Sequence, residues 1–547
     1  MNVLFNDEPP VTLHYNLDMI FRSPYPQVTV PPSAITPFVL QKSRRLHRKP
    51  ALIEALTGRT LTYGALAEGI RRVAAGLNRL GFKRSDVIAL CSPNSCDYAI
   101  VFHAAVSLGG ICTTLNPTFT VEELVRQLKD SGACCLFTVP ELIDKALQAA
   151  NEAGIRMLLT PEPCRDAVSL QSFLDSADAP PEVPIDPRVD LAALPYSSGT
   201  TGFPKGVMLT HYNLVANLLQ IEAAGHAGEN DILICVLPFF HIYGMQVILN
   251  LGLYQGATIV ILPRFELATY LRVMQEYHVT FAHVVPPMVL ALSKNSPVND
   301  FDLSSLQRMF CAAAPLSEAI TLACEERLHC RIRQGYGMTE ASPSTHQAPW
   351  NPDRNRYGTA GFPISNTECR IVDPSTHRDC AAEEEGEIWI RGPQIMRGYL
   401  GHPGATAAVL QDGWYRSGDI GIADTEGRFR IVDRLKEMIK YKGFAIAPAE
   451  LEAALLTHPA VADAAVISCA DEEAGEIPKA YVVLKTPATS DELMDHVAEH
   501  VAPYKKVRAI EFVGLIPRSP SGKILRRVLV EHEKRIQEEK RLSSGAN

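Results

Sequence analysis

One stretch of small and hydroxylated residues is suited to holding a phosphate group. It contains Ser197, Ser198, Gly199, Thr200, Thr201, Gly202, Phe203, Pro204, Lys205 and Gly206. Glycines let a backbone approach an anion closely, while hydroxyl and amide groups donate hydrogen bonds to phosphate oxygens. Lys205 adds a compact positive charge. The common phosphate-loop pattern GxxxxGK[ST] is absent, and such residues also form ordinary surface turns. Composition alone therefore leaves both a phosphate loop and a surface turn open.

Four further motifs follow this loop along the chain. They are residues 334–340 (QGYGMTE), 415–419 (YRSGD), 433–444 (DRLKEMIKYKGF) and 520–524 (PSGKI). Together with the loop 197–206 they resemble, in order and spacing, the adenylate-forming enzymes, which include acyl-CoA synthetases, peptide-synthetase adenylation domains and beetle luciferases. The resemblance spans roughly residues 30 to 530. Residues 237–244 (LPFFHIYG) and 313–316 (AAPL) are similar to those of 4-coumarate–CoA ligases, including the bacterial ones.

The resemblance implies a reaction in two steps. A carboxylate is a poor electrophile, and joining it to the α-phosphate of ATP gives a reactive acyl-adenylate and releases pyrophosphate. The acyl group then passes to a thiol, that of coenzyme A, and AMP is released. Because two anions must meet in the first step, cations and amides are needed around them. The expected activity is that of an AMP-forming acyl-CoA ligase of the 4-coumarate–CoA ligase type.

The resemblance also assigns nucleotide-binding roles. Glu340 would carry Mg²⁺, Thr339 would donate to the α-phosphate, and Asp419 and Arg434 would hold the ribose. The expected nucleotide and CoA contacts are Ser197, Ser198, Gly199, Thr200, Thr201, Gly202, Lys205, Ala313, Gln334, Gly335, Thr339, Asp419, Arg434, Lys436, Arg264, Lys442 and Gly443.

Three residues are expected to act in catalysis. By the resemblance, Lys523 bridges the substrate carboxylate and the α-phosphate in the first step. The C-terminal domain then rotates about a hinge near Lys436, and the face that carries Lys440 replaces Lys523. His241 would gate the acyl pocket, although a buried structural histidine is the alternative.

The expected acyl pocket indicates an aromatic acid. Its predicted lining is Tyr243, Val247, Phe310, Ala312, Gly337, Ser344 and Thr345, with Ala313 along the walls. Phe310 should narrow the pocket and Ser344, Thr345 and His346 should make its far end polar, which favours 4-coumarate or caffeate over sinapate or a fatty chain. Plant 4-coumarate ligases usually have Gln where this chain has Ala445, so we expect turnover to be weakened but not abolished.

Other functions remain open at this stage. A stand-alone adenylation enzyme that loads a carrier protein in trans, a medium-chain fatty acyl-CoA ligase and a luciferase-type oxygenase share these loops. A non-catalytic nucleotide sensor would need neither Lys440 nor Lys523. Acyl-CoA formation with CoA alone, tested over a panel of acids, separates these alternatives.

The elements that position these residues predict an α/β fold. Helical spacing behind Thr62, strands at 87–91, 111–115 and 134–139, and helices at 98–107 and 121–129 alternate as in a parallel sheet with helices on its faces. We expect a large N-terminal domain (1–433) with parallel-rich sheets and flanking helices. A small, mobile α+β C-terminal domain (434–547) should follow.

Composition excludes several classes of protein. The chain has 547 residues and a net charge of −9, which argues against a nucleic-acid binder. No unbroken apolar run reaches the roughly 18 residues of a membrane span, and no signal peptide is evident. The 13 scattered cysteines contain no CxxC pair, so we expect reduced thiols, no zinc and a cytoplasmic location. A monomer or weak dimer is the expected assembly.

Overall fold

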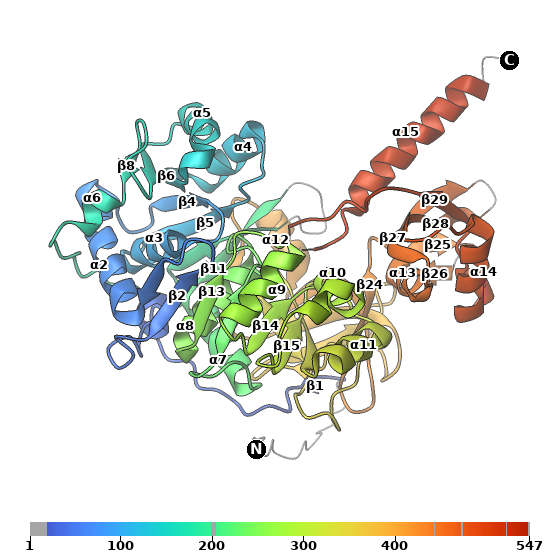
Figure 1. Cartoon of the computed structure of the whole chain (residues 1–547). Helices are drawn as coiled ribbons and strands as arrows, with labels where there is room; N and C mark the ends of the chain where they lie inside the picture. The colour runs from blue at the N-terminus through green and yellow to red at the C-terminus, as the bar shows by residue number, and fades with distance from the viewer. Residues whose placement is uncertain (1–18, 198–203, 442–443, 472–473, 521, 545–547) are drawn as a thin grey trace.

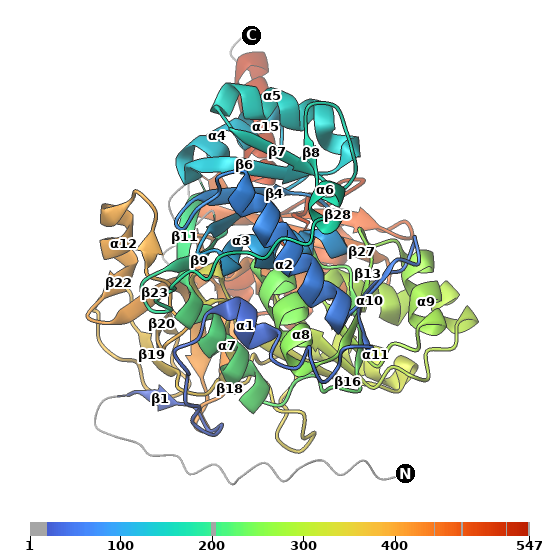
Figure 2. The same ribbon diagram turned by 90° about the vertical axis from the view of Figure 1, so that its left-hand side faces the viewer.

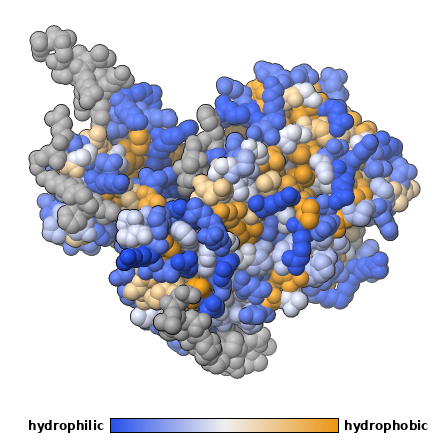
Figure 3. Space-filling view, turned by 180° about the vertical axis from the view of Figure 1, so that it is seen from behind, coloured by the Kyte–Doolittle hydropathy of each residue, from blue (hydrophilic) through white to orange (hydrophobic). Residues whose placement is uncertain are grey.

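The computed structural model describes residues 19–197, 204–441, 444–471, 474–520 and 522–544 (Figure 1). Within them the chain forms three sheets in a main lobe and one sheet in a smaller lobe, here called the C-terminal lobe, which runs from β25 to α15. Seen from behind, the smaller lobe stands beside the main lobe, and hydrophilic and hydrophobic groups are mixed over the surface (Figure 3). The predicted α/β class is therefore confirmed.

The first sheet of the main lobe is built on parallel strands. Its parallel strands are β4 (Val87–Cys91), β5 (Ile111–Leu115), β6 (Ala133–Thr138), β7 (Met157–Thr160), β8 (Val168–Ser169) and β9 (Leu191–Leu194). Antiparallel β11 (Lys205–Thr210), β10 (Tyr196–Ser197) and β21 (Gly398–Tyr399) extend one edge. The helices between the strands are α2 (Tyr63–Arg79), α3 (Cys96–Ser107), α4 (Val121–Ser131), α5 (Ile143–Ala153) and α6 (Gln171–Leu174).

The helix α2 illustrates why these segments fold as they do. Its N-cap Thr62 accepts a hydrogen bond from Ala65 N, which satisfies one of the free amides of the first turn. Leu66, Ile70 and Val73 recur on one face and are buried. Figure 2 shows α2 across the near side of the molecule. The predictions for 62–81, 87–91 and 111–115 are confirmed.

The second sheet carries most of the candidate site. Its parallel strands are β2 (Pro50–Glu54), β13 (Thr258–Ile261), β12 (Ile232–Cys235), β14 (Phe281–Val284), β15 (Arg308–Cys311) and β16 (Arg331–Gly337). Antiparallel β3 (Thr60–Thr62), β17 (Ser344–Gln347) and β18 (Phe362–Pro363) complete the edges. One continuous apolar core joins this sheet to the first one through α2, α3 and α7 (His211–Ala223).

The third sheet of the main lobe is antiparallel. It contains β1 (Phe21–Arg22), β19 (Glu368–Val372), β20 (Gly386–Arg391), β23 (Trp414–Ala423), β22 (Leu410–Gln411) and β24 (Phe429–Arg434). A separate small core around Ile371, Ile388 and Phe429 holds it together. This sheet supplies the side chains expected at the ribose.

The C-terminal lobe has cores of its own. Its strands are β25 (Ile439–Tyr441), β26 (Phe444–Ile446), β27 (Val461–Asp471), β28 (Gly475–Leu484) and β29 (Ala509–Phe512), and its helices are α13 (Pro448–Thr457), α14 (Ser490–His500) and α15 (Arg526–Ser544). One cluster centres on Leu451, Val466 and Val482, and another joins Tyr481 to Leu529 of α15. In Figure 1 the far end of α15 points away from both lobes.

Two global observations accompany the fold. Among the described helices, none is long and apolar enough to cross a membrane. All 13 cysteines are free thiols.

Candidate active site

The parallel strands of the second sheet deliver the candidate residues to one edge. Cys235 of β12 is in register with Ile261 of β13, and Cys311 of β15 with Gln334 of β16, so these strands end together. The segments that follow contain His241 after β12, Arg264 after β13, Ala312 and Ala313 after β15, and Thr339 and Glu340 after β16. Ligands of open α/β sheets bind at the carboxyl ends of the strands. The topology therefore makes this edge the place for a substrate.

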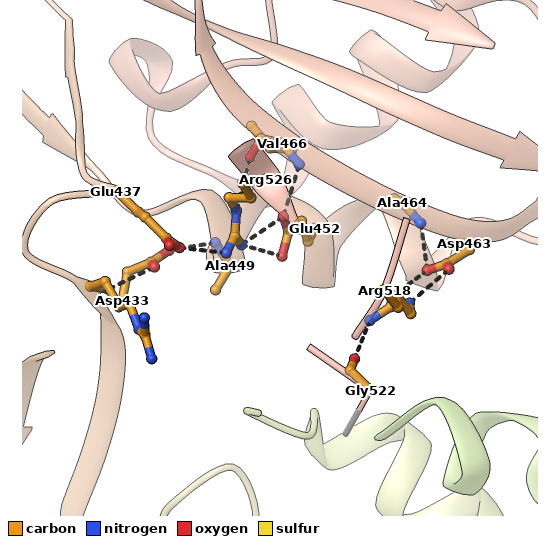
Figure 4. Close-up of polar contacts among 11 residues, drawn as sticks. Asp433, Glu437, Ala449, Glu452, Asp463, Ala464, Val466, Arg518, Gly522 and Arg526 are labelled. Atoms are coloured by element: carbon orange, nitrogen blue, oxygen red, sulfur yellow. Dashed lines mark hydrogen bonds and ion pairs between the residues drawn. The ribbon is translucent and has the colours of Figure 1, made fainter. Parts of the chain in front are cut away.

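Lys523 reaches this edge from the C-terminal lobe. The preceding Gly522 (φ +83°) lies against α10 (Pro286–Lys294), where an added Cβ would come within 3.0 Å of Val285 Cγ2. Lys523 N donates to Ser519 Oγ at 3.1 Å, and Arg518 donates to Gly522 O at 2.9 Å while it also binds Asp463 (Figure 4). Glycine is favoured at 522 because of the positive φ, and a side chain there would also press on Val285.

Charged groups from three separate segments act on Lys523. Burial and the neighbouring Arg434 lower the pKa of Lys523, whereas Asp419 and Glu340 act in the opposite direction. Burial, with a further contribution from Lys523, lowers the pKa of His241 to about 3. His241 is therefore neutral here and cannot serve as a cation. The structure brings these five predicted residues together.

Asp419 and Arg434 face each other on neighbouring strands. They are register partners on β23 and β24, and Arg434 Nε lies 3.6 Å from Asp419 Oδ1. Tyr336 donates its hydroxyl to Asp419 Oδ2 at 2.5 Å. Burial raises the pKa of Asp419, and Arg434 and Tyr336 oppose that rise. One carboxylate with two available oxygens can accept hydrogen bonds from both hydroxyls of a ribose.

Glu340 is buried beside the predicted phosphate loop. It is 3% exposed, and Tyr399 donates its hydroxyl to Oε1 at 2.9 Å. Lys205 Nζ lies 5.8 Å from the centre of the same tyrosine ring. Ser197 and Lys205 are paired across β10 and β11, which fixes both ends of the loop. Ser198, Gly199, Thr200, Thr201 and Gly202 lie outside the described residues.

The loop after β15 is held by Gln334. Its side-chain oxygen accepts from Leu316 N at 2.9 Å and its nitrogen donates to Leu316 O at 3.1 Å. Ala313 in this loop has φ +79°, a conformation that non-glycine residues rarely adopt. Such strain is typical of functional loops that their surroundings hold in place. Gln334 therefore positions Ala312 and Ala313, both half-buried.

The predicted acyl-pocket residues come from two elements that face each other. Tyr243 and Val247 lie on the π-helix η2 (Tyr243–Asn250), an irregularity that is frequent at functional sites. Tyr243 donates its hydroxyl to Phe310 O at 3.0 Å. An added Cβ on Gly335 would lie 2.4 Å from Phe310 Cζ, so the phenyl ring lies directly against this glycine. The ring of Phe310 thus occupies space beside Gly335.

The strand β17 contributes the polar residues expected at the far end. Gly337 leaves no room for a side chain, because an added Cβ would lie 2.2 Å from Pro343 O. Thr345 donates its hydroxyl to Tyr336 O at 3.1 Å, and Ser344 Oγ accepts from Gln347 at 3.3 Å. Thr345 therefore uses its proton within the protein, whereas Ser344 Oγ accepts in the bond described. Their contact with an acid stays a prediction.

Three other predicted residues, Arg264, Lys436 and Lys440, are exposed. Lys436 still lies within electrostatic reach of the assembly, because burial and Arg434 lower its pKa while Asp419 acts in the opposite direction. Lys440 lies on β25, where its amide donates to Glu476 at 2.6 Å within the C-terminal lobe. Lys442 and Gly443 lie outside the described residues, as does the side chain of Ala445, whose backbone pairs with Lys440.

The junction between the lobes is fixed by two further groups. Asp433, the last residue before Arg434, accepts a hydrogen bond from Ala449 N at 2.9 Å in the first turn of α13. The N-cap Ala447 has no side chain for that purpose. Arg526 binds Glu437 at 2.6 Å and both oxygens of Glu452 at 2.8 Å (Figure 4). The segment that carries Lys523 is thereby tied to the segment just after Lys436.

The sequence predictions missed three residues of the site. Tyr336 and Tyr399 donate hydrogen bonds to the two predicted carboxylates, Asp419 and Glu340, and Asp433 caps a helix of the other lobe. Tyr336 belongs to the motif 334–340 and could have been found there. Tyr399 and Asp433 act on partners that no local pattern identifies.

Comparisons with known proteins agree with this geometry. The family model "AMP-binding enzyme" matches residues 40–400, and "AMP-binding enzyme C-terminal domain" matches residues 450–523. The chain is 41% identical over 525 residues to 4-coumarate–CoA ligase 2 of Petroselinum crispum, covering 94% of this chain and 96% of that protein. It is 40% identical to the 4-coumarate–CoA ligase of Vanilla planifolia, with 94% and 96% covered.

Solved structures show the same fold. The anthranilate CoA ligase AuaEII in complex with anthranoyl-AMP is 26% identical, with a TM-score of 0.87 and coverage of 93% of this chain and 99% of that one. A benzoate CoA ligase from Burkholderia xenovorans LB400 is 26% identical, with a TM-score of 0.82 and coverage of 91% and 99%. With family models matched across both lobes, the chain belongs to the AMP-binding, adenylate-forming enzymes and stands close to the 4-coumarate–CoA ligases.

Proposed function

We propose that this chain is an AMP-forming acid–thiol ligase that converts a hydroxycinnamic acid, such as 4-coumarate, to its CoA thioester. The observation that carries the proposal is the convergence of Lys523, Asp419, Arg434 and Glu340 at the edge of the second sheet. A half-buried lysine beside a ribose-type carboxylate and a phosphate-side carboxylate fits nucleotide chemistry. The similarity to 4-coumarate–CoA ligases supports the choice of acid.

The first step needs two anions to meet. The substrate carboxylate oxygen attacks the α-phosphorus, the bond from that phosphorus to the bridging oxygen breaks, and pyrophosphate leaves. Lys523 would contact both the carboxylate and the α-phosphate, and Thr339 would donate to the same phosphate. Asp419 and Arg434 would hold the ribose, and Lys205 with Ser197 would support the terminal phosphates. Each role stabilises charge that ATP and the acid bring with them.

The donor set at Glu340 fits magnesium. Among the described residues, no group of three or more His, Cys, Asp or Glu side chains could hold a metal ion. Mg²⁺ in nucleotide enzymes is commonly bound by one or two carboxylates together with substrate phosphates and water. Tyr399 engages Oε1 of Glu340 and leaves Oε2 for a hard cation. Glu340 would hold the ion, whose charge would offset that of the phosphates.

The second step requires the C-terminal lobe to move. After adenylation it would turn about the hinge near Lys436, withdraw Lys523 and bring Lys440, Lys442 and Gly443 to the acyl group. The CoA sulfur then attacks the acyl carbon, the bond to AMP breaks, and the thiol proton passes to solvent. Arg264, exposed at the same edge as His241, is a suitable contact for a CoA phosphate. His241 would gate the route to the acyl carbon.

The test is acid-dependent pyrophosphate and AMP release from the purified enzyme with ATP and Mg²⁺. A panel of cinnamic, benzoic and medium-chain fatty acids is assayed with and without CoA. We expect pyrophosphate release with hydroxycinnamic acids and thioester only when CoA is present. No acid-dependent pyrophosphate release from any acid would overturn the proposal, and a preference for fatty acids would redirect it to a fatty acyl-CoA ligase.

We further propose a cytoplasmic location and a monomer or weak dimer. Thirteen free thiols suit a reducing compartment, where ATP and CoA are also present.

A further inference from the structure

A cluster of buried polar side chains adjoins the predicted acyl pocket. His226, His283 and Arg333 are at most 6% exposed. Aromatic rings enclose them: His283 lies 4.7 Å from the ring of Phe281 and 6.0 Å from that of Tyr243, measured between ring centres. Burying polar groups costs free energy unless each finds a hydrogen-bond partner.

These side chains form a continuous chain of hydrogen bonds. Gln347 donates to Ser344 Oγ at 3.3 Å and accepts from Arg333 at 3.0 Å. Arg333 Nη2 also lies 3.2 Å from His226 Nδ1, and His226 Nε2 lies 2.8 Å from His283 Nε2. The chain therefore runs from a predicted pocket residue, Ser344, to His283.

The direction of every bond in this chain follows from Arg333. Arg333 Nη2 has two protons, which Gly225 O at 2.5 Å, Gln347 Oε1 at 3.0 Å and His226 Nδ1 at 3.2 Å share. A guanidinium offers no acceptor, so a proton on His226 Nδ1 would face a donor and be repelled, and Nδ1 therefore carries none. Burial and nearby positive charges lower the pKa of His226 well below its ordinary value and that of His283 to about 3, so both rings are neutral. A neutral imidazole holds one proton, which in His226 must be on Nε2 and is donated to His283 Nε2. His283 must then carry its own proton on Nδ1.

That proton has no acceptor among the described residues. His283 is fully buried, and its Nδ1 has no hydrogen-bond partner there. A buried donor left unsatisfied costs about 1–3 kcal/mol, so it is a place where a ligand atom can be recognised. His283 is therefore the end of this series of hydrogen bonds at which a donor has no partner.

The position of His283 relates this donor to the acid. His283 on β14 is in register with Phe310 on β15, and the rings of both lie edge-on to that of Tyr243. Two other polar groups named for the pocket donate within the protein: Tyr243 donates to Phe310 O, and Thr345 to Tyr336 O.

We propose that His283 Nδ1–H donates a hydrogen bond to the ring hydroxyl oxygen of the acid and so selects hydroxylated over unsubstituted cinnamic acids. This inference rests on the proposed function, of which it specifies the acid. Because the donor is fixed by Arg333 through His226, the site recognises an acceptor atom in particular. An acid of the same size whose ring substituent mainly donates should be a poorer substrate.

The experiment compares kcat/KM for 4-coumarate, cinnamate and 4-aminocinnamate. We expect the wild-type enzyme to prefer 4-coumarate over cinnamate by about tenfold or more in kcat/KM, which is the contribution of one buried hydrogen bond. We also expect it to use 4-aminocinnamate less well than 4-coumarate. In His283→Ala the ratio of 4-coumarate to cinnamate should fall toward one. His283→Asn, whose amide can place a donor near the position of Nδ1, should restore part of the preference.

A matched control separates selectivity from stability. His103→Ala removes another fully buried histidine, which lies on α3 and bonds Thr36, so it should lower the melting temperature and leave the ratio unchanged. Calorimetric binding of 4-coumarate and cinnamate to each variant gives a second readout if turnover is lost. Equal use of the two acids by the wild type, or an unchanged ratio in His283→Ala, would overturn the inference. Absence of pyrophosphate release with every acid would instead overturn the proposed function.

Discussion

Lys523 has charged neighbours of both signs: the cation Arg434 and the carboxylates Asp419 and Glu340. Burial and Arg434 lower its pKa, so the bare protein holds the lysine in an arrangement that disfavours its charge. Phosphate and carboxylate groups of the substrates would reverse that balance. At the scale of residues, the bound substrates would therefore raise the pKa of Lys523 and stabilise its positive charge.

Replacing Lys523 by alanine tests this residue directly. We expect acid-dependent pyrophosphate release to fall roughly 100-fold or more, because a cation aimed at the reacting phosphate is lost. Thioester formation from chemically prepared acyl-adenylate and CoA should persist. The control is Arg527→Ala, whose side chain is 86% exposed and which should change neither reaction. Equal loss of both half-reactions in Lys523→Ala would contradict the assignment.

Phe310 is the residue that we predict to set the width of the acyl pocket. Its ring lies against Gly335, so Phe310→Ala should open space and raise kcat/KM for a methoxylated acid such as sinapate relative to 4-coumarate. The preceding residue on β15, Met309, points to the opposite face and is fully buried. Met309→Ala should lower the free energy of unfolding by about 2–5 kcal/mol, an amount comparable to that in Phe310→Ala, without changing the acid preference. The measurement is the ratio of kcat/KM for the two acids in each variant, and a ratio that changes equally in both would argue against this role.

At the scale of elements, one carboxylate of α15 binds several groups in the sheet of the C-terminal lobe. Glu533 on α15 binds Lys479 and accepts the Tyr481 hydroxyl at 2.8 Å, and Cys469 lies 3.4 Å from it. Lys479 also donates to Glu511 at 2.7 Å. Burial alone would raise the pKa of Glu533, but the hydrogen bonds from Lys479 and Tyr481 lower it to about 2.

This lowered pKa makes the attachment of α15 dependent on pH. An acid whose folded-state pKa is depressed contributes stability that is present above its unfolded pKa, here near 4.5, and is lost as pH falls toward about 2. Glu533→Gln should remove that contribution at all pH values, expose α15 to proteolysis and destabilise the lobe by about 2 kcal/mol at neutral pH. Melting temperatures measured from pH 7 to 3 should converge for the two proteins. A difference in melting temperature that stays constant from pH 7 to 3 would show that protonation of Glu533 does not control the attachment of α15.

Sequence patterns predicted elements better than contacts between them. The span of α2 followed from the Thr62 cap and a helical repeat, because both are local. The bond of Tyr336 to Asp419 spans 83 positions, and that of His226 to His283 spans 57. Such pairs depend on which strands lie side by side, and no periodicity carries that information. The family motifs located the charged residues of the site, whereas the groups that orient them emerged from the fold.

At the scale of the whole molecule, Asp433 joins the two lobes by capping α13 across the hinge region. Asp433→Ala should leave two amides, those of Arg434 and Ala449, without this acceptor and weaken the present arrangement of the lobes. We expect pyrophosphate release to slow several-fold, while thioester formation from prepared acyl-adenylate stays unchanged or rises.

The comparison for this variant is Asp463→Ala, which loses an ion pair to Arg518 within the C-terminal lobe. It should disturb the segment around Lys523 without altering the hinge. The two half-reactions are measured by pyrophosphate exchange and by thioester absorbance. If Asp433→Ala slowed thioester formation more than pyrophosphate release, the result would contradict the idea that the Asp433 cap on α13 stabilises the present arrangement of the two lobes.

The cations at the lobe junction have a consequence for the timing of the catalytic cycle. Burial lowers the pKa of both Lys523 and Lys436, and Arg434 lowers both further. Lys205 adds to the lowering at Lys436, so these positive groups repel one another at the junction. The negative phosphates of ATP would offset this repulsion and favour the arrangement in which the lobes are together. When pyrophosphate diffuses away it takes most of that negative charge with it. The release of pyrophosphate would then by itself favour the rotation of the C-terminal lobe that precedes the second step.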